Sequence, residues 1–209
     1  MFCTSLVCAS LLGLLPIGAS ATPLISEFFY DAVGSDDGHT FVELYGEPGG
    51  SLDGLNLTGV NGAGGGLGPV ISLSGVFPED GLFVLADRSA EGGSFVVGWD
   101  LLANFDFQNG PDSVQLRAGA VVLDALGYGV FGESLVFAGE GQAAPDAPAG
   151  SSLARHFANL DTNDNSADFL ILGVPTPGAA ALSEIPEPGT ASLVLIGLFG
   201  LAALGRRPR

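Results

Sequence analysis

Residues 113–126 read Ser-Val-Gln-Leu-Arg-Ala-Gly-Ala-Val-Val-Leu-Asp-Ala-Leu, and this stretch decides the fold. Its first five residues alternate, with apolar Val114 and Leu116 set between polar neighbours. Alternation with a period of two predicts a half-buried β-strand with one wet face. The short Arg-Ala-Gly-Ala segment that follows predicts a hairpin connection into a second strand over 121–126.

Similar runs recur outward from this hairpin, separated by clusters of Gly, Pro, Asn and Asp. The run 82–85, Leu-Phe-Val-Leu, is apolar on both faces and predicts a strand in the interior of a sheet. The expected strands lie near residues 24–30, 40–45, 55–60, 70–73, 82–86, 95–97, 113–117, 121–126 and 152–157. Nine short strands with few helix signals predict an all-β fold, an antiparallel β-sandwich. The glycine-rich segment 59–68 predicts a strand connection.

Charge and composition exclude several functions. The chain has no lysine, and its net charge is −17. Between residues 22 and 188, three arginines stand against all 23 acidic residues, which argues against nucleic acid or an anionic membrane surface as a partner. A Walker A nucleotide-binding motif and a Schiff-base nucleophile both require lysine, so the absence of lysine excludes both. The acidity fits divalent cations, cationic partners or simple solubility.

The first 21 residues predict a secretory signal peptide. An apolar segment precedes Ala19-Ser20-Ala21, an A-x-A site whose Ala19 and Ala21 would direct cleavage after residue 21. No basic residue precedes the apolar segment, so either the true start lies upstream or the α-amino group serves instead. Both cysteines, Cys3 and Cys8, fall inside this segment, and the exported chain is therefore expected to contain no disulfide.

The last 25 residues have three parts in order. Pro186-Glu187-Pro188 comes first, an uncharged apolar run over 190–204 follows, and Arg206, Arg207 and Arg209 stand at the end. As a helix this run would be about 22 Å long at ~1.5 Å per residue, short for a bilayer core of about 30 Å. The run can span the bilayer if the bilayer thins locally and the arginine side chains reach up to the interface. The three arginines favour the cytoplasmic side of the membrane.

This tail resembles the PEP-CTERM sorting signal of Gram-negative bacteria. The resemblance implies recognition by an exosortase, cleavage near Pro186–Pro188, and passage from a membrane-anchored intermediate to the cell envelope or exterior. It also implies association with exopolysaccharide and biofilm matrix. The expected organisation is a signal peptide over 1–21, a folded domain over 22–174, a linker over 175–188, and a transmembrane sorting helix with its basic tail over 189–209.

A second resemblance covers residues 24 to 178. The motifs that carry it, in order, are Leu24-Ile25-Ser26-Glu27, Phe41-Val42-Glu43-Leu44-Tyr45, Asp112-Ser113-Val114-Gln115-Leu116, Ser151-Ser152-Leu153-Ala154-Arg155 and Pro175-Thr176-Pro177-Gly178. This series is similar to bacterial lamin-tail domains. The resemblance implies an immunoglobulin-like β-sandwich that serves as an extracellular binding or structural module, with no catalytic residues to assign in this chain. Tyr45-Gly46 departs from the Tyr-Asn usual in the family.

One loop has the donor pattern of a cation site. Asp161, Asn163 and Asn165 place oxygen atoms at alternate positions, and Asp168 adds a carboxylate, so these four residues are the candidate Ca²⁺ ligands. The EF-hand pattern fails, because positions six and twelve are Ser and Leu. The alternative is an Asx-turn loop whose side chains bond its own backbone. A second acidic loop contains Asp31, Asp36 and Asp37.

No catalytic set emerges from the sequence. Glu27 and Glu43 lie in predicted strands and could pair as in a glycosidase, although strand residues that shape the sandwich are the commoner case. His39 and His156 are the two histidines. An aromatic group, Trp99 with Phe95, Phe105 and Phe107, is either a sugar-stacking patch or core packing.

The expectation is therefore a non-enzymatic exported protein of the envelope or matrix, with no cofactor beyond a possible Ca²⁺. Its expected partners are an exosortase, the membrane before processing, and extracellular polysaccharide. The alternatives are a Ca²⁺-dependent adhesion or carbohydrate-binding module and, third, a polysaccharide or phosphoester hydrolase.

Overall fold

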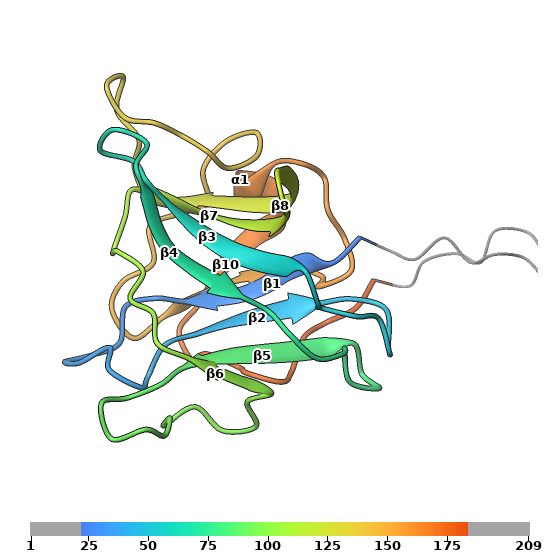
Figure 1. Ribbon diagram of the computed structural model, residues 1–209. Coiled ribbons are helices and arrows are strands. Elements are labelled where there is room, and N and C mark those ends of the chain that lie inside the picture. Colours follow the sequence, from blue (N-terminus) through green and yellow to red (C-terminus); the bar gives the residue numbers. More distant parts are fainter. Residues whose placement is uncertain (1–21, 184–209) are drawn as a thin grey trace, which may run out of the picture.

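Two β-sheets pack face to face in the computed structural model, which describes residues 22–183 (Figure 1). The six-stranded sheet has the order β10-β9-β1-β2-β5-β6 and the four-stranded sheet the order β4-β3-β7-β8. The strands are β1 Leu24–Phe29, β2 Phe41–Tyr45, β3 Leu55–Asn61, β4 Leu67–Ser72, β5 Leu82–Asp87, β6 Leu101–Ala103, β7 Asp112–Ala118, β8 Val121–Tyr128, β9 Ser152–Arg155 and β10 Phe169–Leu172. Every neighbouring pair is antiparallel except β5 and β6. The predicted all-β sandwich is thus confirmed at the level of two packed sheets.

The core lies between the sheets and draws on both. Phe28, Leu44 and Leu85 from the large sheet meet Leu57, Leu116 and Leu126 from the small one in one continuous buried cluster.
An aromatic group stands at its centre: the Phe28 ring lies 5.2 Å from the rings of both Tyr30 and Tyr128. Burial of these side chains is the main stabilising term for the fold.

The predicted hairpin is present. Ala118 pairs with Val121 across the Gly119–Ala120 turn, and Val114 and Leu116 point into the core. The wet face predicted for β7 is wrong at Ser113, which is buried. The segment after β8 folds back over this face: Ser113 Oγ accepts from the Ala138 amide, and Gln115 Nε2 donates to the Ala138 carbonyl.

Gly127 of β8 permits that cover. A side chain at this position would collide with the ring of Phe137, which lies against the strand. The loop after β8 therefore reaches the sheet only because glycine presents bare backbone there.

Strand β5 is buried on both faces, as its apolar run predicts, and has neighbours on both sides. Phe83 and Leu85 face the core, whereas Val84 and Ala86 pack outside the sheet with Val96. The strand predicted over 95–97 is wrong. These residues form a bend in the loop between β5 and β6, and that loop covers the outer face of the large sheet.

The sequence prediction missed three elements. Strand β6 has three residues and runs parallel to β5, and β10 completes the edge beside β9. Helix α1, Asn165–Asp168, is a single turn in the loop proposed for calcium, and the Asp164 side chain caps it by accepting from the Ser166 amide. Among residues 22–183, none of the helices has the length and apolar character needed to cross a membrane. The predicted signal peptide and sorting helix lie outside the described residues.

Candidate functional site

Arg155 takes part in every ion pair found among residues 22–183. It ends β9, is 5% exposed, and its guanidinium contacts two carboxylates closely, Asp124 at 2.7 Å and Asp168 at 2.8 Å. Asp161 lies farther away, at 3.4 Å. Arg155 Nε also donates to the Ile25 carbonyl at 2.8 Å, and the guanidinium lies 4.6 Å from the centre of the Phe169 ring.

This ion pair connects the two sheets. Arg155 belongs to the large sheet and Asp124 to β8 of the small one. Asp124 is fully buried, and its second oxygen accepts from the Ile25 amide of β1. Burial disfavours the charge on Arg155, but Asp124, Asp161 and Asp168 outweigh it and raise the pKa of the guanidinium.

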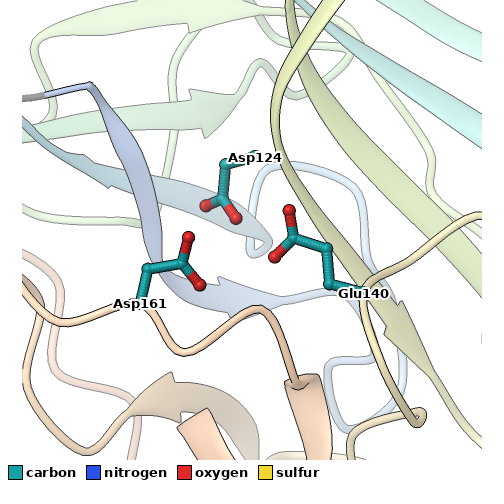
Figure 2. Close-up of side chains that lie close together, drawn as sticks. All are labelled: Asp124, Glu140 and Asp161. Atoms are coloured by element: carbon teal, nitrogen blue, oxygen red, sulfur yellow. The ribbon is translucent and has the colours of Figure 1, made fainter.

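Glu140, which is half-buried in the segment between β8 and β9, adds a further carboxylate to the cluster. Oxygen atoms of Asp124, Glu140 and Asp161 lie within 4.8 Å of one another, and Figure 2 shows the three side chains turned toward a common point. Burial, followed by the nearby charges of Asp124 and Asp161, raises the pKa of Glu140 to about 7. Its Oε2 is buried and has no hydrogen-bond partner within residues 22–183.

The predicted calcium loop is built differently from a cation cage. Asn165 is buried, and its side chain links β8 to the loop that follows it. Its Oδ1 accepts from the amides of Gly127 and Glu140, and its Nδ2 donates to the Ala125 carbonyl. Asp168 accepts from the Thr162 amide and hydroxyl as well as from Arg155.

The remaining two residues of the loop follow the Asx-turn alternative. Asp161 accepts from the Asn163 amide, and Asn163 has a left-handed backbone with φ of 58°. The structure thus directs most of these oxygen atoms to protein donors. Calcium binding at Asp161, Asn163, Asn165 and Asp168 stays a prediction.

Glu27 and Glu43 come together on the outer face of the large sheet, where they are register partners in β1 and β2. Both are buried, and Glu43 is 0% exposed. Ser152 Oγ donates to Glu27 and Ser26 Oγ donates to Glu43, each at 2.5 Å. Burial raises the pKa of Glu43 to about 7 against the opposing hydrogen bonds from Ser26 and Gly178.

The two glutamates hold residues 175–183, which we call the strap. The Thr176 amide and hydroxyl donate to the two oxygens of Glu27, and the Gly178 amide donates to Glu43 at 2.7 Å. The sequence predicts a linker over 175–188, and within its first nine residues Thr176 and Gly178 bond to the sheet, whereas Ala181 and Ser183 bond to the loop after β9. Residues 184–188 lie outside the described residues.

The aromatic residues and histidines singled out in the sequence differ in how far they are buried. Phe105 and Phe107 belong to the core, whereas Phe95 is 64% exposed and Trp99 44% exposed. His39 is exposed and stacks on Phe95, with ring centres 4.3 Å apart, and His156 is also exposed.

In the second acidic loop, Asp36 and Asp37 accept from backbone amides. With Asp87 and Asp106, they line a cavity of about 400 Å³.

The cluster around Arg155 was missed at the sequence level, although a signal for it exists. Arg155 is one of three basic residues between positions 22 and 183, and it follows the strand residues Ser-Leu-Ala. A scarce cation in an apolar strand indicates a buried partner. The identity of the partner, Asp124, depends on the packing of the two sheets.

Comparison with known proteins identifies the C-terminal region. Residues 184–209 match the family model described as the PEP-CTERM protein-sorting motif. No curated protein and no solved structure matches the chain. The chain therefore carries a PEP-CTERM sorting signal, which implies export, a membrane-anchored intermediate, processing by an exosortase, and a final place in the cell envelope or extracellular space.

Proposed function

We propose that this protein is a non-enzymatic component of the cell envelope or extracellular matrix that associates with exopolysaccharide. The observation that carries the proposal is the sorting motif over 184–209, attached to a folded β-sandwich. The resemblance of residues 24–178 to lamin-tail domains supports an immunoglobulin-like binding or structural module.

The buried carboxylates of the sandwich support a structural role. Glu27, Glu43, Asp124 and Asp168 each accept hydrogen bonds from protein donors, and these bonds join strands, loops and the strap. A catalytic pair must instead present its oxygens to a substrate within hydrogen-bond reach. The exposed rings of Phe95 and Trp99 offer a surface on which sugar rings could stack.

Intact mass tests the proposal. Protein recovered separately from the membranes and the culture medium of its native host is expected to begin near Thr22 and to end near Pro186–Pro188. An added mass in multiples of a hexose would identify attachment to polysaccharide. A chain that still carries Arg206–Arg209 and is found only in membranes would contradict processing and release.

A second candidate is a calcium-dependent adhesion module. The observation that favours it is that carboxylate oxygens of Asp124, Glu140 and Asp161 lie within 4.8 Å of one another, and that Glu140 Oε2 has no hydrogen-bond partner within residues 22–183. Calcium sites of extracellular modules bind at about 10⁻⁴–10⁻³ M.

This candidate predicts calorimetric binding of Ca²⁺ at pH 8, where Glu140 is ionised, and stabilisation of about 1 kcal/mol at millimolar Ca²⁺. E140Q should abolish both effects, and E133Q, an exposed site in the same loop, is the matched control. Absence of heat and of any shift in melting temperature at 10 mM would remove the candidate.

A further inference from the structure

The strap ends three residues before Pro186 in the sequence, where the predicted processing site begins. Its last residue, Ser183, is held at both backbone groups: the Ser183 amide donates to Asn159 Oδ1 at 2.7 Å, and Asn159 Nδ2 donates to the Ser183 carbonyl at 2.8 Å. The match to the sorting motif begins at the next residue, 184. The sandwich therefore holds the chain up to the boundary of its own sorting signal.

We propose that docking of the strap on Glu27, Glu43 and Asn159 restrains cleavage of the chain at Pro186–Pro188, and that release of the strap makes this site reachable. The proposal rests on the proposed function, in which the chain is processed at this motif. It makes Glu27, Glu43 and Asn159 positioning residues for a reaction that another enzyme carries out. That reaction breaks one peptide bond: the acyl group passes to water or to an amine acceptor, and the released amine takes up the proton that this nucleophile loses.

The length of chain explains the restraint. Pro186 is three residues beyond Ser183, and three residues of fully extended chain reach at most about 11 Å. When the strap is released, the free chain begins after Leu172, the end of β10, and 14 residues reach at most about 50 Å. With the strap docked, the cleavage site cannot lie more than about 11 Å from Ser183, and in the proposal this short reach hinders a membrane-embedded enzyme.

The contacts of the strap suit a segment that can leave while the sandwich stays folded. Six hydrogen bonds hold it: three to the glutamates, two to Asn159, and one from the Ala158 amide to the Ala181 carbonyl. Little apolar surface supports them, because residues 178–182 are exposed. A cavity of about 200 Å³, lined by Glu27, Glu43 and Ala179–Ala181 among others, remains beneath the strap. Segments with few buried apolar contacts open at lower free energy than the whole fold.

The test compares rates of processing for the full chain in a host that contains its exosortase. The protein is pulse-labelled, and the fraction shortened is followed by mass. One variant carries N159A, which removes both contacts to Ser183. A second carries six Gly/Ser residues between Ser183 and Glu184, which restores reach and leaves the strap and the sandwich unchanged. The control carries the same insertion between Gly173 and Val174, upstream of the docked segment.

We expect N159A and the insertion after Ser183 each to increase the rate of processing at least threefold. A chain that carries both changes should be processed no faster than the faster of the two single variants. The control insertion should process near the wild-type rate. A purely structural role for Asn159 would not produce this pattern, and the insertion keeps the test valid if N159A folds poorly. Equal rates in all variants would overturn the strap proposal alone, whereas absence of cleavage in the wild type would overturn the proposed function with it.

Discussion

Replacement of Arg155 by methionine is expected to lower the free energy of unfolding by about 3–5 kcal/mol. Methionine keeps most of the volume of the side chain but leaves Asp124 as a buried charge without a counter-ion. It also removes the donors to Asp168 and to the Ile25 carbonyl. Urea unfolding at pH 7 measures the change, and R88M, at an exposed position, is the control with an expected change near zero.

A double variant separates the charge from the packing. In R155M/D124N the amide oxygen of residue 124 can still accept from the Ile25 amide, but no buried charge remains. We therefore expect the double variant to be more stable than R155M alone. A loss below about 1 kcal/mol in R155M, or a double variant that is less stable than R155M, would contradict the importance assigned to this ion pair.

The stability of the protein is expected to fall as pH rises from 5 to 8, and Glu43 should account for about 2–3 kcal/mol of that fall. Burial raises the pKa of Glu43 from 4.5 to about 7 in the folded protein. Between these values the folded state binds the proton and the unfolded state does not. The contribution is therefore fully present below the unfolded pKa and is lost as pH rises through about 7.

E43Q tests this assignment because glutamine imitates the neutral carboxyl group. The amide oxygen of the glutamine can accept from the Gly178 amide, and its amide NH₂ can donate to Ser26 Oγ. Unfolding in urea at pH 5, 6, 7 and 8 should show a flatter profile than wild type, with E43Q the more stable protein at pH 8. Glu27 and Asp80 are the charged groups whose proximity adds to the shift, so D80N should change the profile in the same direction but less. Parallel profiles for E43Q and wild type would refute the assignment.

The two predictions concern opposite ways of burying a charge. Burial raises the pKa of Asp124, and the Arg155 guanidinium opposes that rise through a direct ion pair, so loss of either partner is costly. Glu43 is buried with hydroxyl and amide donors and beside Glu27, so its charge is what burial disfavours. The first arrangement holds the two sheets together, and the second holds the strap.

The sequence predicted those features that depend on interactions between residues close together in the chain. The strand pattern of Val114 and Leu116 and the turn at Gly119 are local, and both were found where predicted. The run 95–97 carries the same apolar signal as a strand, but Val96 uses it to cover Val84 and Ala86 from a loop. Burial alone does not distinguish a strand from a loop that packs on one.

The loop 161–168 shows the limit for polar residues. Alternating side-chain oxygen atoms predict a cation site, and calcium binding there stays a prediction. The sequence did not show that Asn165 of this loop accepts hydrogen bonds from backbone amides of distant segments. Asn165 meets Gly127 and Glu140, which are 38 and 25 residues away in the sequence. Contacts of this kind have no local signature.

By itself, the sequence determined the all-β class, the hairpin over 113–126 and the sorting motif over 184–209, because each depends on neighbouring residues read in order. Only the tertiary structure decided that Arg155 meets Asp124 across the two sheets and that Glu27 and Glu43 hold the strap. These contacts join residues 31, 149 and 135 positions apart. Removing charges and amides from water costs free energy unless they are paired, and which groups pair with one another is a property of the packed sheets.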